Sequence, residues 1–170
     1  MNDIFIEQLI TRKPDNRATT IKIGILVLTA LLCTIIVLAI MFIPNTLAIG
    51  LMAIIGAIWL SGSIVKGLHT EYEYILTNQE FDIDKISGKR KRRRMITLDL
   101  TNTEKFDRYN ESTSLLDSDV TVSAHDNSLV NLWYLTVKHN SHGRVALLFN
   151  PSENFLEMLN KALPPKFRLK

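Results

Sequence analysis

Residues 23–43 read IGILVLTALLCTIIVLAIMFI and residues 47–65 read LAIGLMAIIGAIWLSGSIV, with only Pro44-Asn45-Thr46 between them. Neither run contains a charged residue or a proline. At about 1.5 Å of rise per residue, helices of these lengths match the roughly 30 Å hydrocarbon core of a bilayer. Helices buried in a soluble protein of this size are rarely apolar all the way round. The two runs therefore predict a transmembrane hairpin at residues 23–65, with antiparallel spans.

Positive charges flank the hairpin on both sides. Arg12, Lys13, Arg17 and Lys22 precede the first span, Lys66 follows the second, and the connecting loop is uncharged. Lysine and arginine favour the cytoplasmic side of a membrane. We therefore expect a multi-pass protein of the inner (cytoplasmic) membrane with both termini in the cytoplasm.

The second span carries a stripe of small side chains at intervals of three or four residues. Such stripes allow helices to approach closely within a bilayer. The stripe predicts packing against the first span or against a second copy of the chain, and consists of Thr46 followed by Gly50, Ala53, Ala57 and Ser61. Cys33 is the only cysteine, and the spans contain no other ionisable group. This composition is typical of an anchor rather than of a transport pathway.

The chain divides into three parts by composition. Residues 1–22 form an approach, residues 23–65 the hairpin, and residues 66–170 one domain of ordinary size. In the approach, Ile4, Phe5 and Leu9 share one helical face and Pro14 ends the segment. We expect a short amphipathic helix there, with a frayed terminus as the alternative.

Alternating apolar and polar residues after Lys66 predict strands. Three of them, centred on Tyr74, Phe81 and Leu98, are separated by turns at Asn78-Gln79 and Ser87-Gly88 and predict an antiparallel meander. The later prediction comprises a helical turn at 103–109, a loop at 111–119, strands at 120–124, 132–138 and 145–149, and hairpin turns at 125–128 and 140–143.

A final helix is predicted from Asn150 to Pro164-Pro165. Asn150 is its expected N-cap, with Pro151 at the first helical position and Glu153 reaching back in a capping box. The expected fold is thus an α+β membrane protein. In it, the transmembrane hairpin precedes a small antiparallel β-barrel or curved sheet whose open end is covered by this helix.

The strand order with its closing helix resembles bacterial pleckstrin-homology-like (PH-like) domains that follow paired membrane helices. Their first hairpin is similar to Tyr74-x-Leu76-Thr77-Asn78 and Phe81-x-Ile83-x-Lys85-x-x-Gly88-Lys89-x-Lys91-Arg92. The whole chain resembles a family of small bacterial membrane proteins of unknown function, through Met1-Asn2-Asp3, Glu7-Gln8-Leu9, Arg12-Lys13-Pro14 and the turn Gly88-Lys89-Arg90-Lys91-Arg92. The resemblance implies an architecture and supplies neither an activity nor a headgroup pocket.

One basic run stands out, at a predicted turn and the start of the next strand: Lys89, Arg90, Lys91, Arg92, Arg93 and Arg94. Residues 66–170 hold 16 basic and 14 acidic residues, so without this run the segment would carry a net charge of −4. Near anionic lipid each cation contributes about 1 kcal/mol. The alternatives are a solvated turn, an acidic protein partner, or nucleic acid, against which the lack of interleaved aromatic residues argues.

Sites for catalysis or metal are not indicated. His139-x-x-His142 lies on a predicted turn with no cysteine or carboxylate at ligand spacing. Asp82 and Asp84 alternate with apolar residues, so we expect them, like Glu71 and Glu73, to face water or to pair with Lys85 and Lys89. We find no nucleophile with a matched base and no phosphate-binding loop, and expect neither an enzyme nor a cofactor.

The expected function is that of an integral membrane protein without known biochemical activity, acting as a membrane-anchored interaction module. Its expected partners are membrane lipids, especially an anionic lipid surface, or an unknown protein partner, with self-association through the hairpin. The alternative is a small accessory subunit of a larger membrane complex, acting through its transmembrane helices.

Overall fold

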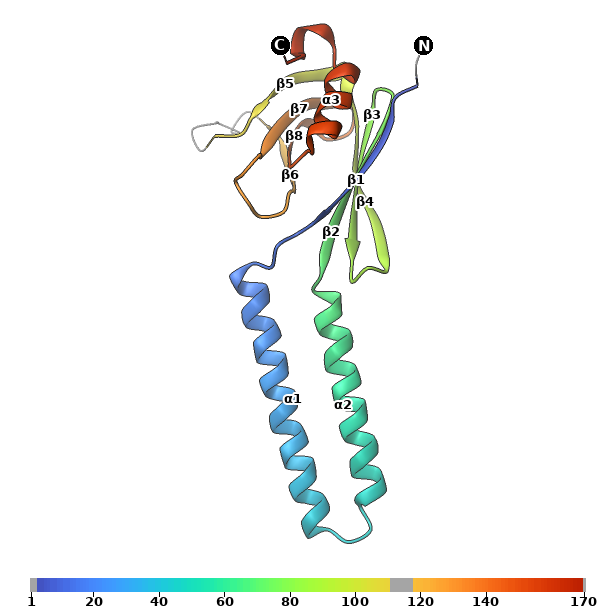
Figure 1. Ribbon diagram of the computed structural model, residues 1–170, viewed down its shortest axis with the longest axis vertical. Helices are drawn as coiled ribbons and strands as arrows, with labels where there is room; N and C mark the ends of the chain where they lie inside the picture. Colours follow the sequence, from blue (N-terminus) through green and yellow to red (C-terminus); the bar gives the residue numbers. More distant parts are fainter. Residues whose placement is uncertain (1–2, 111–117, 170) are drawn as a thin grey trace. The chain divides into compact units, whose positions relative to one another are not determined.

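The computed structural model describes residues 3–110 and 118–169 of the chain (Figure 1). Its contacts divide the chain into two compact units. One unit is Pro14–His69 and contains the two long helices. The other unit, which we call the β domain, combines the residues up to Lys13 with those from Thr70 onward.

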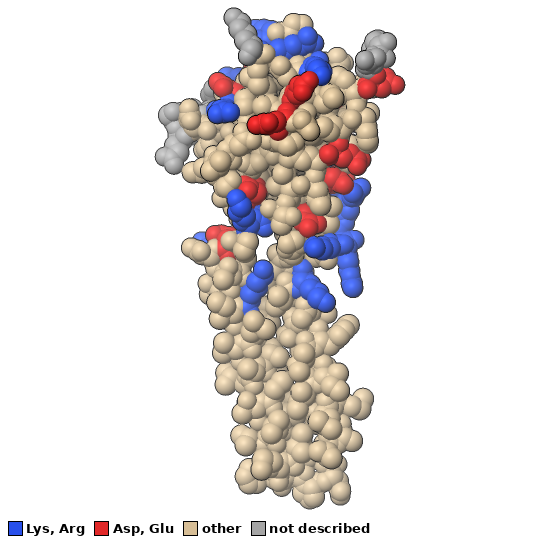
Figure 2. All heavy atoms as spheres, viewed as in Figure 1, with Lys and Arg blue, Asp and Glu red and all other residues tan. Residues whose placement is uncertain are grey.

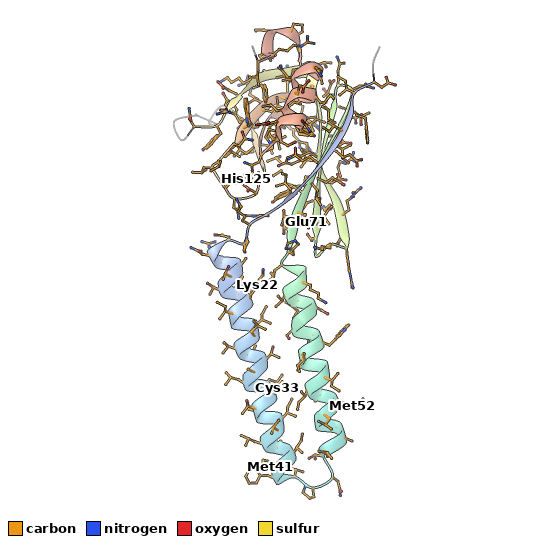
Figure 3. The ribbon with its side chains drawn as sticks, viewed as in Figure 1. Lys22, Cys33, Met41, Met52, Glu71 and His125 are labelled. Carbon is orange, nitrogen blue, oxygen red and sulfur yellow. The ribbon has the colours of Figure 1, made fainter. Side chains whose placement is uncertain are left out.

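The helical unit consists of α1 (Asn16–Phe42) and α2 (Leu47–Gly67). Both are long and apolar enough to cross a membrane. Of the most apolar 18-residue stretch of each helix, 0% is buried in α1 and 6% in α2. Their leucine and isoleucine side chains project outward along the helices (Figure 3). A core helix of a soluble protein would be mostly buried, so α1 and α2 are candidate membrane spans, as the sequence predicts. The α1 helix begins seven residues before its apolar run, where the Asp15 carboxylate accepts a hydrogen bond from Asn16 N.

The β domain contains two four-stranded sheets. In the first sheet, β1 (Phe5–Thr11), β2 (Thr70–Thr77), β3 (Glu80–Ser87) and β4 (Lys91–Asp99) lie in sequence order and pair antiparallel. The predicted meander is confirmed as β2 to β4. Positive φ angles at Asn78 and Gly88 allow the two tight turns between its strands.

The N-terminal segment is a strand, so the predicted amphipathic helix within residues 1–22 is wrong. Ile6 and Ile10 pack against the core from one face of β1, while Phe5 and Leu9 are exposed on the other face. This period of two is compatible with a strand once a partner is available, and the partner is β2, beyond both long helices. The boundaries 1–22, 23–65 and 66–170 therefore change, because the helix pair interrupts a domain that begins before it.

The second sheet has the order β5-β7-β8-β6, from β5 (Thr103–Arg108), β7 (Trp133–His139), β8 (Gly143–Phe149) and β6 (Val120–Ala124). Residues 103–108 are a strand after a short 3-10 turn η1 (Leu100–Asn102), so the helical turn predicted at 103–109 is wrong. The strand at 120–124 is confirmed, but it pairs in parallel with β8, so residues 125–128 form no hairpin. Most of the loop predicted at 111–119 lies outside the described residues.

Among the described residues the two sheets do not close into a barrel, so the fold class is confirmed only as two long apolar helices combined with β-sheets and a C-terminal helix, with β1 before the helices and the other strands after them. That helix, α3 (Glu153–Ala162), buries Phe155, Leu159 and Ala162 in the shared core and precedes a second 3-10 turn, η2 (Pro165–Phe167). Phe155 lies within a cluster of aromatic rings with Tyr74, Phe81 and Phe149. The packing of α3 on this core therefore holds both sheets together.

The predicted N-cap of this helix is wrong by two residues. Ser152 caps α3 by accepting a hydrogen bond from Phe155 N at 3.2 Å. Asn150 is buried and accepts from Asp126 N at 3.0 Å through its side chain, and its own N–H donates to the Tyr74 hydroxyl at 3.2 Å. Burial raises the pKa of the Tyr74 phenol, so this group stays neutral. The bond from Asp126 N occupies the side-chain oxygen of Asn150 that would otherwise cap the helix.

The alternation in β1 yields a test of the strand assignment. We expect Ile6→Ala to lower the free energy of unfolding of the β domain by about 1–2 kcal/mol, because Ile6 packs against the core. Phe5→Ala should change it by less than about 0.5 kcal/mol, since 63% of Phe5 is exposed. Urea titration of the full chain in mild detergent, followed by Trp133 fluorescence in a Trp59→Phe background, measures both. Equal losses at the two positions would contradict the strand.

Candidate functional site

One end of the β domain collects the points where the chain leaves for the long helices and returns. β1 ends at Thr11, which pairs with Glu71, and β2 begins at Thr70, which pairs with Ser87. Ser87 in turn pairs with Lys91, across the β3–β4 turn. The basic turn therefore lies at the same end of the first sheet as both connections to α1 and α2. We call this the helix-linked end of the β domain.

The basic turn is a tight turn with two residues in the left-handed backbone conformation. Gly88 and Lys89 have φ angles of 60° and 58°, and Arg90 N donates to Ser87 O at 3.3 Å. Two consecutive positive φ angles are typical of a type I′ hairpin turn, whose twist matches that of the strands. Lys89 and Arg90 are exposed at its tip. Figure 2 shows Lys and Arg side chains gathered along this edge of the β domain.

Strand alternation divides the basic run into two groups. Arg94 Nε lies 2.7 Å from the Asp84 carboxylate, and another nitrogen of Arg94 lies 2.7 Å from Asp82. Arg92 forms an ion pair with Glu73 and lies 3.9 Å from Asp84. Arg92 and Arg94 are thus held by carboxylates of β2 and β3. The pairing of Asp82 and Asp84 with Lys85 and Lys89 predicted from the sequence is wrong.

A β-bulge creates this arrangement. Ile83 pairs with Ile96 whereas Asp84 pairs with Arg94, so Met95 is an additional residue in β4. The shift places the guanidinium of Arg94 opposite Asp84, a carboxylate that is only 4% exposed. The hydrogen bond to Asp84 raises the pKa of Arg94 above its ordinary value. A buried carboxylate requires such a partner to offset the loss of hydration.

The other four cations form the candidate site: Lys89, Arg90, Lys91 and Arg93. All four are exposed, and none has an ion-pair partner among the described residues. Four exposed cations at one edge create a local positive potential inside a domain that is otherwise acidic. Such a surface attracts anionic groups without requiring a closed pocket.

The structure separates the residues of the small-residue stripe. Gly50 and Ser61 are the buried residues of α2, Ala57 is half-buried and Ala53 is exposed. A methyl group added at Gly50 would lie 2.4 Å from Ile40 Cδ1 in α1, so the Ile40 side chain would have to move to admit any larger residue there. The stripe therefore contributes to the packing of α2 on α1 through Gly50 and does not form one continuous exposed face.

The two histidines that the sequence places on a turn stack on each other. The rings of His139 and His142 lie 4.9 Å apart, and His139 Nδ1 accepts from the backbone N–H of Ser141 at 3.1 Å. Among the described residues, no group of three or more His, Cys, Asp or Glu side chains is arranged to hold a metal ion. His139 also lines an open pocket of about 620 Å³ between Asn78 and Asn140, at the end of the β domain opposite to the basic turn.

A second cluster at the helix-linked end was missed by sequence reasoning. Lys13 Nζ lies 2.9 Å from the Asp126 carboxylate, and Arg12 Nε donates to the Asn127 side chain at 3.0 Å. Burial, together with the charge of Arg12, lowers the pKa of His125. Because the two segments lie more than a hundred residues apart in the chain, only their opposite charges offered a signal.

Comparison with family models finds a match to the bacterial PH-like domain (DUF6106) over residues 2–169. The match spans β1, both long helices, both sheets and α3. No curated protein and no solved structure matches the chain.

The division of the basic run predicts that substitutions at neighbouring positions differ in their effect on stability. Arg94→Ala should lower the free energy of unfolding by about 1–3 kcal/mol, because it leaves the buried Asp84 carboxylate without its main partner. Arg93→Ala is the matched control and should change it by less than about 0.5 kcal/mol. The same urea titration measures both variants. A stable Arg94→Ala protein would show that the ion pair contributes nothing.

Helix packing at Gly50 makes a further prediction. Gly50→Leu should separate α1 and α2, whereas Gly56→Leu should not, because no atom lies within 4 Å of an added methyl group at Gly56. The readout is oxidative cross-linking of native Cys33 to an Ala57→Cys substitution. Two helical turns separate Cys33 from Ile40 and Ala57 from Gly50, so the antiparallel helices bring them to one level. Equal cross-linking in the two leucine variants would contradict this packing.

Proposed function

The chain belongs to the bacterial PH-like domain family (DUF6106), and on this premise we propose that it is an integral membrane protein whose β domain binds anionic lipid headgroups. The proposed binding residues are Lys89, Arg90, Lys91 and Arg93. Two candidate membrane spans joined to a PH-like domain fit a membrane-associated module. In this proposal the β domain binds lipid and catalyses no reaction.

The observation that carries the proposal is the position of these cations at the helix-linked end. From Gly67, the last residue of α2, to Thr70 the chain has three steps and reaches at most about 11 Å. The basic turn directly follows Ser87, the last residue of β3, and Ser87 pairs with Thr70. A bilayer spanned by α2 would therefore bring its headgroups within reach of the turn.

The orientation follows from strand pairing and charge. Because β1 and β2 pair with each other, the residues before α1 and after α2 belong on one side of the membrane. A hairpin of two spans meets this requirement. Lys22 and Lys66 border the apolar runs on that side, which supports a cytoplasmic location for the β domain at the inner membrane.

Other roles receive less support. An accessory subunit that used the small-residue stripe to bind its partner would need the whole stripe to be free, but Gly50 packs against α1 of the same chain and Ser61 is buried. A protein partner recognised through acidic groups would use the same four cations as the lipid. We favour the lipid because a membrane spanned by α1 and α2 would supply an anionic surface without any further component.

The lipid proposal predicts protection that depends on lipid charge. In nanodiscs containing anionic phospholipid, amide exchange across the β3–β4 turn of the full chain should be slower than in neutral nanodiscs. At about 1 kcal/mol for each cation, replacing all four by glutamine should abolish this difference, and high salt should weaken it. Hydrogen–deuterium exchange followed by mass spectrometry measures the effect.

A control variant carries the same change in net charge on exposed lysines elsewhere in the β domain: Lys105, Lys138, Lys161 and Lys166. It should retain the protection in anionic nanodiscs. Identical exchange of the wild-type turn in anionic and neutral nanodiscs would overturn the proposal.

A further inference from the structure

The loop between β6 and β7, residues 125–132, exposes two adjacent apolar side chains. Leu129 is 64% exposed and Val130 is 79% exposed, the highest value for a large apolar side chain among the described residues of the β domain. Leu132, at the end of the same loop, is buried. An exposed apolar pair is unfavourable in water and often marks a contact surface.

The backbone of this loop is held by hydrogen bonds. The Asp126 carboxylate accepts from the N–H and the hydroxyl of Ser128, at 2.8 and 2.7 Å. The Asn150 side chain donates to Val130 O at 3.1 Å. The loop is thus fixed on both sides of Leu129, and the two apolar side chains are presented outward in a prearranged position.

The same loop is attached to the helix-linked end. Lys13 N donates to Asp126 O at 3.0 Å, in addition to the Lys13–Asp126 ion pair. Arg12 N donates to Thr70 O at 3.0 Å, which joins this point to the first residue of β2. Only Pro14 and Asp15 separate Lys13 from α1. Figure 3 shows His125 at the start of the loop, and Figure 1 shows the loop and the β3–β4 turn at one end of the β domain.

We infer that Leu129 and Val130 insert into the bilayer at the boundary between headgroups and acyl chains. The ligand is the apolar part of membrane phospholipid, whatever its headgroup charge. The inference rests on the proposed membrane insertion of α1 and α2, and it is independent of the basic turn. Lipid is the favoured occupant because the loop is bonded to residues close to the long helices. Lys13, just before α1, bonds to Asp126 of the loop, and Arg12 beside it bonds to Thr70, just after α2. Apolar side chains on a surface beside a bilayer partition about 5–10 Å into its interface.

The test uses the full chain in vesicles that contain lipids with a shallow spin-label quencher. In a Cys33→Ser background, a polarity-sensitive fluorophore is attached to a Leu129→Cys variant. The matched control is an Asn140→Cys variant, on the β7–β8 turn at the opposite end of the β domain. We expect quenching at least about twofold stronger at position 129 than at position 140. Circular dichroism checks that both labelled proteins remain folded.

Lipid charge and salt separate this inference from the proposed role of the basic turn. Quenching at position 129 should persist in neutral vesicles and at high salt, and also after Lys89, Arg90, Lys91 and Arg93 are replaced by glutamine. Equal quenching at positions 129 and 140 would overturn the inference. A blue-shifted label at position 129 without quenching by lipid would overturn it too, because a protein rather than the bilayer would then cover the loop.

Discussion

The pairing of β1 with β2 is the constraint on which the other features depend. These strands are neighbours in one sheet, yet residues 12–69, including both long helices, lie between them in the chain. The helical pair is therefore an insertion between two adjacent strands, and both of its ends are fixed by the same sheet. The chain thus leaves the first sheet and returns to it at two neighbouring strands, β1 and β2. The pairing of β1 with β2 determines which residues lie at the helix-linked end.

Buried carboxylates decide which cations at that end remain available. Asp84 is nearly inaccessible and Glu73 is largely covered, so each requires a positive partner, and the bulge at Met95 supplies Arg94 and Arg92. A run of six basic residues thus performs two jobs. Two arginines stabilise the first sheet, and the remaining four face solvent. Structural and surface charge are interleaved along one strand because successive side chains point to opposite faces.

Local patterns predicted the parts of the fold whose partners are close in sequence. The meander from β2 to β4 follows from period-two alternation and turn residues, and α1 and α2 follow from their uncharged runs. β1 and the parallel β6–β8 pair were not predicted, because an isolated strand carries no information about a distant partner. The helix start was placed two residues early because Asn150 and Ser152 are both good capping residues, and only tertiary contacts choose between them. The sequence predicts the candidate site as one continuous basic run. Which of its residues are paired with carboxylates and which are exposed depends on the register of β4 against β3, which the sequence alone does not show.

The insertion also has a consequence for the order of events during biosynthesis. When β1 leaves the ribosome, its partner strand does not yet exist, and β2 is made only after both apolar helices have been synthesised. The hydrogen bonds from Gln8 of β1 to Asn150 and from Lys13, just after β1, to Asp126 form later still. Sheet completion is therefore a non-local, late step, which loop-closure entropy makes slow. Under the proposed membrane insertion, a chain with only one of the two helices inserted would hold β1 and β2 on opposite sides of the bilayer, and the first sheet could not form.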